Sequence, residues 1–378
     1  MTHKSIFREL MRYATLAESF DKLEGTSSYL EKNDIIADLL EKAPPELMEM
    51  VVPLMLGSVY PAYVSKETGI GHQQLKKAVA MASGYSSSRV DKLMEKVGDL
   101  GGVASQLLSK KRQVTLFKGF LSVEKVFENI KKLPEITGPG SVDRKIGTVA
   151  ELLADSSPVE AKFITRTVLG DLRIGVAEGR LRDAVARAFD VSADVVEHAY
   201  MLTTDYGKVA KAAAEGGRKG LEKLGLTVGH PVNPMLAQRA ESVEEVLRRM
   251  GGKAAFETKL DGIRIQVHKD GGEIILFTRR MEDYTKMFPD LEGPLREALR
   301  PDRAIVDGEL VAIDRGTGKP MPFQEVLKRR RKYKISRAIK EIPVEVHLFD
   351  VLLFGERTVL GEPYTKRRRE LEKMVRES

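Results

Sequence analysis

The chain has 378 residues, of which 42% are hydrophobic and 31% are charged, so it can form about two or three globular domains and is not disordered as a whole. The absence of cysteine excludes disulfides, thiolate zinc sites and cysteine nucleophiles. The net charge of +7 favours a polyanionic partner, although a basic soluble protein without such a partner is the alternative.

The first ten residues contain no apolar signal core, and no apolar run approaches the roughly 18 residues that a membrane-spanning helix needs. We therefore expect a cytoplasmic protein that does not enter membranes. Abundant lysine, arginine and glutamate, together with the absence of cysteine and tryptophan, favour a thermophilic source.

Residues 1–228 are predicted to form a helical domain. Apolar residues recur there at steps of three and four, as in the series Leu10, Tyr13, Ala14 and Leu16. Short segments rich in glycine, proline and serine separate the predicted helices: residues 44–45, 69–71, 101–102, 138–140 and 156–158.

A candidate phosphate site lies at the start of one predicted helix. Ser141 follows Gly138-Pro139-Gly140, and the exposed amides at such a helix start can receive a phosphate. Basic side chains would add positive charge nearby: Arg144, Lys145, Arg166 and Arg173. These residues are therefore candidate DNA contacts, with an ordinary turn and solvated surface charge as the alternative.

The pattern changes between residues 225 and 238, where prolines and glycines cluster, and the domain boundary is predicted after residue 228. Residues 229–378 are predicted to form an α+β domain with a largely antiparallel sheet. Period-two alternation of Ile263, Ile265 and Val267 with polar residues predicts a strand with one polar face at 263–267. Three more strands are predicted at 273–278, 304–313 and 344–354. Helices are predicted at 242–250, 291–299 and 323–332. The fold class is thus multidomain, with an all-α domain followed by an α+β domain.

The segment Lys259-Leu260-Asp261-Gly262 places a primary amine at a predicted junction between a strand and a turn. Glu257 precedes the lysine by two residues, and Arg264 follows it by five. A lysine near fixed cations can lose its proton and attack phosphorus. Taken alone, Asp-Gly is also a strong signal for a type I′ hairpin turn, so the motifs downstream decide between the two interpretations.

Three further motifs supply side chains that suit attack on a nucleoside triphosphate. Arg279, at the end of a predicted strand, and Arg264 can offset phosphate charge. Glu309 can hold Mg²⁺ or a ribose hydroxyl, and Phe349 offers an aromatic face to a purine. The predicted chemistry is in-line displacement at phosphorus, dominated by positioning and charge neutralisation.

Each of these motifs has a structural alternative. Arg279 and Arg280 could be a solvated pair, Asp307-Gly308-Glu309 could be a β-bulge with solvated acids, and Phe349 could be a core residue. The basic run at residues 328–332 could be a wet helix face or could bind a phosphate backbone.

The ordered set of these motifs resembles the successive motifs of covalent nucleotidyltransferases, and the wider match is to archaeal ATP-dependent DNA ligases. Residues 167–183 resemble the signature in that family's helical DNA-binding domain. Residues 234–237 resemble the segment that leads into its adenylation domain. The resemblance covers essentially the whole chain.

The resemblance implies an ATP-dependent DNA ligase that seals nicks in duplex DNA during replication, repair and recombination, with ATP and Mg²⁺ as cofactors. Lys259 would take AMP from ATP, AMP would pass to the 5′-phosphate at the nick, and the 3′-hydroxyl would displace it. The implied roles are Glu257 beside the adenine, Arg264 and Arg279 on ribose or phosphate, Glu309 near the ribose and as metal ligand, and Phe349 stacked on the base.

Two departures from the family pattern stand out. Leu260 replaces a frequent tyrosine, from which we expect little effect. The later adenylation motifs and the OB-fold domain do not occur before Ser378. We therefore expect a fragment with an incomplete adenylation domain, which binds nicked DNA but adenylates itself poorly or not at all. A monomer is expected, with a sliding clamp as a candidate partner.

Three alternative functions are an RNA ligase, a capping-type guanylyltransferase, and a non-catalytic DNA-binding protein that kept a dead nucleotidyltransferase fold. The long helical N-terminal region argues against the first two. The presence of Lys259, Arg264 and Glu309 argues against the third.

Overall fold

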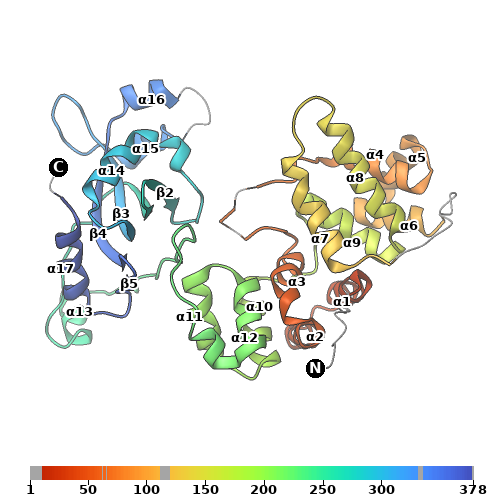
Figure 1. Ribbon diagram of the computed structural model, residues 1–378, viewed down its shortest axis with the longest axis horizontal. Coiled ribbons are helices and arrows are strands. Elements are labelled where there is room, and N and C mark those ends of the chain that lie inside the picture. The colour runs from red at the N-terminus through yellow and green to blue at the C-terminus, as the bar shows by residue number, and fades with distance from the viewer. Residues whose placement is uncertain (1–10, 62, 65, 111–119, 331–334, 377–378) are drawn as a thin grey trace, which may run out of the picture. The chain divides into compact units, whose positions relative to one another are not determined.

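The computed structural model of the protein describes residues 11–61, 63–64, 66–110, 120–330 and 335–376 (Figure 1). The chain divides into two compact units, residues 1–224 and 225–378, and the boundary predicted after residue 228 lies four residues further along. No helix within the described residues has the length and apolarity needed to cross a bilayer.

The first unit is helical throughout its described part, as predicted. Its helices are α1 (Tyr13–Gly25), α2 (Tyr29–Lys42), α3 (Met48–Met55), α4 (His72–Ser83), α5 (Ser87–Val97), α6 (Leu100–Leu108), α7 (Val123–Lys132), α8 (Ser141–Asp155), α9 (Pro158–Leu169), α10 (Glu178–Ala188), α11 (Ala193–Thr203) and α12 (Tyr206–Leu221). One continuous apolar core joins these helices, with α6 packed on α9, α4 on α8, α2 on α10 and α3 on α12.

The second unit is built on a five-stranded antiparallel sheet with strand order β2-β1-β3-β4-β5 (Figure 1). The strands are β1 (Ile263–Asp270), β2 (Glu273–Thr278), β3 (Arg303–Ala312), β4 (Val344–Phe354) and β5 (Arg357–Thr358). The four predicted strands are confirmed, and in β1 the alternation of apolar and polar residues marks the two faces of the sheet. The two-residue strand β5 was not predicted, since it is too short to show a period.

The sheet has one apolar face and one face that carries polar side chains. Ile265 and Val267 of β1 pack with Val306 and Leu310 of β3 in the apolar core of this unit. On the opposite face, Arg264 pairs in register with Glu309, and Gln266 with Asp307. This second face supplies the functional side chains.

The α-helices in the described part of this unit are α13 (Val243–Arg249), α14 (Glu292–Ala298), α15 (Phe323–Leu327), α16 (Ile335–Glu341) and α17 (Tyr364–Met374). The helix predicted at 323–332 is wrong in extent, because α15 ends at Leu327. Arg329, just beyond that end, is fully buried, with its guanidinium paired with Asp290 and lying 4.7 Å from the centroid of the Phe288 ring. A continuous solvent-exposed helix face, which was one alternative for residues 328–332, is not compatible with a buried Arg329.

Candidate functional site

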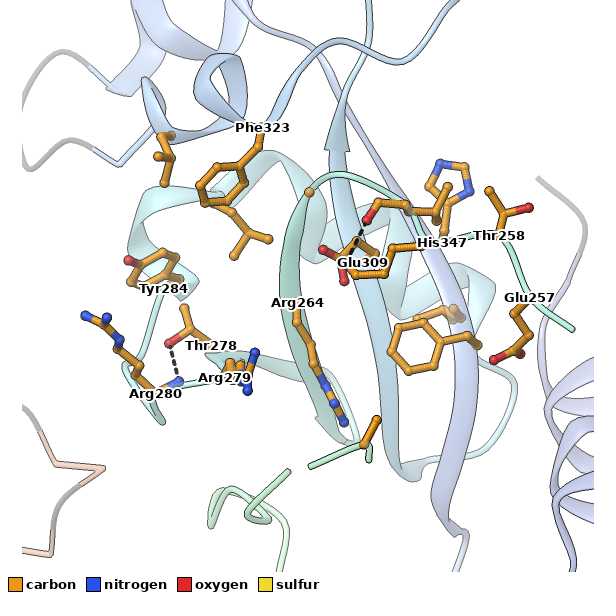
Figure 2. Close-up of a pocket in the computed structure, with 18 of the residues that line it drawn as sticks. Glu257, Thr258, Arg264, Thr278, Arg279, Arg280, Tyr284, Glu309, Phe323 and His347 are labelled. Carbon is orange, nitrogen blue, oxygen red and sulfur yellow. Dashed lines mark hydrogen bonds between the residues drawn. The ribbon is translucent and has the colours of Figure 1, made fainter. Parts of the chain in front are cut away.

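A cleft of about 1090 Å³ opens on the second unit. Its walls are the start of β1, the end of β2, the end of β3, the first half of β4 and the segment that precedes β1. Figure 2 shows Glu257 and Arg280 at opposite ends of its lining, with Arg264 and Glu309 between them. All six nucleotide-site candidates named from the sequence line this cleft: Glu257, Lys259, Arg264, Arg279, Glu309 and Phe349.

Lys259 lies on an exposed extended segment outside any strand, so its predicted place at a strand junction is wrong by a few residues: β1 begins only at Ile263. Its ammonium group donates a hydrogen bond of 3.3 Å to the carbonyl of Leu260. Gly262 carries the chain so close to β3 that a Cβ atom there would lie 2.4 Å from the carbonyl oxygen of Leu310. The Asp-Gly pair therefore serves a close approach of two strands and not a hairpin turn.

Arg264 is held in place by a buried carboxylate. Its guanidinium donates to Asp307 over 2.6 Å, and the amide of Gln266 donates to the other oxygen of Asp307 over 3.2 Å. Burial raises the pKa of Asp307, and the charge of Arg264 opposes that shift. A buried carboxylate costs much free energy unless it is paired, so this contact fixes the arginine at the cleft wall.

Glu309 lines the cleft from β3, next to a shift in the β3–β4 register between Asp307 and Gly308. Asp307 pairs with Asp350 and Gly308 with Leu348, so the unpaired residue at this shift is Phe349 of β4, and the irregularity does not lie at residues 307–309, where the sequence suggested a bulge. Partial burial raises the pKa of Glu309, while the positive charge of Lys259 acts in the opposite direction. The amine and the carboxylate thus face the same space.

The donor set for a metal ion is small. Within the described residues no group of three or more histidine, aspartate and glutamate side chains could hold a cation. Mg²⁺ is commonly bound by one or two carboxylates together with substrate phosphates and water. Glu309 fits that pattern as a single protein ligand beside a triphosphate, and it does not fit a site made of protein ligands alone.

The other end of the cleft is basic. Arg279 and Arg280 are exposed at the end of β2, and neither forms an ion pair with any described residue. Arg330 pairs with Glu282 over 3.0 Å and lies 5.6 Å from the centroid of the Tyr284 ring. Arg279 and Arg280 therefore offer unneutralised charge, which suits a phosphate.

Phe349 lies half-buried at the cleft wall, 5.6 Å from the guanidinium of Arg264. It is not a core residue, so the structural alternative for this position is wrong. An aromatic ring at a cleft wall beside a cation suits stacking of a nucleobase.

Buried hydrogen bonds, which the sequence did not reveal, connect the start of this unit to its sheet. The side-chain amide of Gln266 accepts a hydrogen bond from the amide of Val232 over 2.7 Å. His268 accepts one from the amide of Gly229 over 3.1 Å and contacts Gln266 over 2.9 Å. Both side chains are buried, so the polar face of β1 is not solvated at these two positions. Burial, with a smaller contribution from His230, lowers the pKa of His268 to about 3.

We expect His268 alone to lower the free energy of unfolding of the second unit by about 2 kcal/mol between pH 8 and pH 5. In the unfolded chain the imidazole keeps its ordinary pKa of 6.5, whereas in the folded chain the value is about 3. The unfolded chain therefore binds a proton in this window that the folded chain does not. The stability that the neutral, buried His268 contributes is fully present above pH 6.5. It is lost progressively as the pH falls from 6.5 toward 3, the pKa of His268 in the folded chain.

Urea unfolding followed by hydrogen exchange in β1 measures this loss. His268→Gln should be less stable at pH 8 but should lose less stability on acidification. His72→Gln, at an exposed position on the first unit, should behave as the wild type. If wild type and His268→Gln lose equal stability, the burial account of this histidine is wrong.

The candidate DNA contacts lie on the first unit and differ in accessibility. Ser141 begins α8 after Gly140, which has a positive φ of 71°. Arg144 is exposed and donates to the carbonyls of Pro139 and Thr137. Lys145 donates to the carbonyl of Thr68 over 3.1 Å. These three side chains share one helix start.

Arg166 and Arg173 differ from that group. Arg166 is 5% exposed and pairs with Asp99 over 2.8 Å and Glu24 over 3.0 Å, which joins α9 to α6 and α1. That arrangement gives Arg166 a structural role and leaves little of its guanidinium for a phosphate. Arg173 is exposed and pairs with Asp171 over 2.6 Å.

The basic run at residues 328–332 is largely neutralised in its described part. Lys328 pairs with Glu325 over 2.5 Å, Arg329 with Asp290, and Arg330 with Glu282. Residues 331 and 332 lie outside the described residues. A cation that is paired with a carboxylate attracts a phosphate backbone less than a free cation does. The ion pairs therefore favour a structural role for the described part of this basic run.

Two protein-family models match the chain. The family described as "DNA ligase N terminus" matches residues 12–186, and the one described as "ATP dependent DNA ligase domain" matches residues 234–378. The two matched ranges fall within the two compact units, and the second contains every residue that lines the cleft.

Curated relatives agree with this assignment. A DNA ligase of Thermococcus fumicolans is 46% identical over 369 residues, covering 97% of this chain and 66% of the relative. A DNA ligase of Methanopyrus kandleri is 42% identical with the same coverage. The chain thus spans about two thirds of the length of the curated relatives it matches. Among solved structures, the ligase domain of M. tuberculosis LigD aligns over 31% of this chain and 35% of that one, at 30% identity and a TM-score of 0.25.

Proposed function

The chain belongs to the ATP-dependent DNA ligase family, and from this premise we propose that it carries the nucleotidyl-transfer site of an enzyme that seals nicks in duplex DNA. The observation that supports the proposal is the convergence in one cleft of an amine, a carboxylate, arginines and an aromatic ring. That set matches what phosphoryl attack requires: a nucleophile, charge neutralisation and a surface for the base.

In the first proposed step, Lys259 Nζ attacks the α-phosphorus of ATP. A P–N bond forms, the bond to the bridging oxygen breaks, and pyrophosphate leaves. Arg264 and Arg279 offset phosphate charge, Glu309 faces the ribose or a Mg²⁺ ion, and Phe349 stacks on the base. Mg²⁺, when bound, would neutralise phosphate charge.

In the later steps, an oxygen of the 5′-phosphate at the nick displaces Lys259 from AMP. The 3′-hydroxyl then attacks that phosphate, and AMP leaves as the strand is sealed. The helical unit would hold the duplex, with Ser141, Arg144, Lys145 and Arg173 as candidate phosphate contacts. Arg166 would act there only by supporting the fold. A cytoplasmic location and a monomeric state also belong to the proposal, and a sliding-clamp partner belongs to it on the resemblance alone.

A sealing assay on matched nicks tests the substrate. With ATP and Mg²⁺, we expect the longest natural protein that contains residues 1–378 to bind and seal a 5′-phosphorylated nick in duplex DNA, and to seal the same nick in duplex RNA at least about tenfold more slowly. A nick without the 5′-phosphate is the control, because it has no acceptor for AMP. Equal sealing of both nicks would favour an RNA ligase, and labelling by GTP without sealing would favour a guanylyltransferase.

A further inference from the structure

The carboxylate of Glu257 is fixed by a residue far away in the sequence. Glu257 lies on the exposed extended segment before β1, where no strand pairing holds the backbone. The hydroxyl of Tyr364, in the first turn of α17, donates a hydrogen bond to one oxygen of this carboxylate. This contact is the one side-chain hydrogen bond to Glu257 among the described residues.

Tyr364 is itself anchored to the sheet. The guanidinium of Arg367 lies 5.6 Å from the centroid of the Tyr364 ring. Arg367 also binds both oxygens of Asp350, over 2.8 and 3.0 Å, and the carbonyl of Glu362 over 2.6 Å. Asp350 directly follows Phe349 on β4. The contacts therefore form a continuous path from the aromatic wall of the cleft, through α17, to Glu257.

A carboxylate held in this way can distinguish two purines. Ionised carboxylates only accept hydrogen bonds. Adenine presents an amino group at its 6-position, which donates, whereas guanine presents an oxygen there, which accepts. With one oxygen of Glu257 bound by Tyr364, the other can accept from adenine and would repel guanine.

We propose that Tyr364 is a positioning residue that fixes the Glu257 carboxylate at the cleft and thereby sets the preference for ATP over GTP. The inference rests on the proposed function, because Glu257 reads the base only if the cleft holds a purine nucleotide. Tyr364 touches no reacting atom, and its effect is exerted through Glu257.

Tyr364→Phe removes the hydroxyl and keeps the ring over Arg367. The ratio of the Kd for GTP to the Kd for ATP, measured by calorimetry on residues 1–378, is expected to fall about tenfold. Binding of inorganic tripolyphosphate should not change, because that probe has no base. In a Glu257→Gln background, the same substitution should have no further effect on the ratio.

Tyr29→Phe is the matched control, since it removes a tyrosine–carboxylate hydrogen bond to Asp183 on the helical unit. It should leave the nucleotide ratio unchanged. An unchanged ratio in Tyr364→Phe, or an equal loss of affinity for ATP and GTP, would overturn the inference and leave the proposed function intact. A wild-type chain that binds neither nucleotide would instead count against the proposed function, and the inference would fall with it.

Discussion

Replacing Lys259 with alanine is expected to lower covalent AMP transfer by a factor on the order of 10³ or more, because it removes the nucleophile itself. Lys259→Arg should lower covalent AMP transfer to a similar extent. Its guanidinium keeps the positive charge but stays protonated, so it has no lone pair for attack on phosphorus. The two variants together separate the loss of a nucleophile from the loss of a charge.

The measurement is retention of label from α-labelled ATP on denatured protein, in the presence of Mg²⁺. It should be made on residues 1–378 and on the longest natural protein that contains them, since the chain spans about two thirds of its curated relatives. Lys253→Ala is the matched control: this lysine is exposed on the same extended segment but does not line the cleft. Label retained by Lys259→Ala at the wild-type rate would rule this lysine out as the nucleophile.

Removing one partner of the buried Asp290–Arg329 pair is expected to destabilise the second unit by about 3 kcal/mol. In Asp290→Asn, the guanidinium of Arg329 stays fully buried without a counter-charge. We expect a loss at the lower end of the usual range for buried ion pairs, because 25% of the Asp290 side chain is exposed to solvent. The change in unfolding free energy can be read from urea unfolding with hydrogen exchange in β3.

Two further variants identify the cause. The double substitution Asp290→Leu with Arg329→Met removes both charges and should recover most of the lost stability. Glu325→Gln breaks the more exposed pair with Lys328 and should stay within about 0.5 kcal/mol of the wild type. A loss in Glu325→Gln as large as that in Asp290→Asn would show that burial of the pair is not the cause.

Local patterns in the sequence predicted most of the fold. The strands at Glu273–Thr278 and Val344–Phe354 match their predicted bounds, because a short segment rich in β-branched and aromatic residues is visible in the local sequence. The helix predicted at 323–332 was too long, since a run of cations does not reveal that Arg329 turns inward to Asp290. Whether a charge is buried depends on partners that are distant in sequence.

The candidate site shows the same limit. Motif order indicated which residues gather at the cleft, including Lys259 and Glu309. It could not indicate that Asp307 clamps Arg264, because that contact depends on the register between β1 and β3. The bond from Tyr364 to Glu257 spans 107 residues and follows only from the packing of α17. Such contacts need the tertiary structure, which single-sequence patterns do not contain.

The central claim is that the amine of Lys259 becomes covalently bonded to AMP. Tandem mass spectrometry of the protein after incubation with ATP and Mg²⁺ tests it most directly, because fragmentation assigns the adduct to one side chain. We expect a single AMP on the peptide that contains Lys259, removed when excess pyrophosphate is added. An adduct on any other residue, or none in the longest natural form of the protein, would contradict the account.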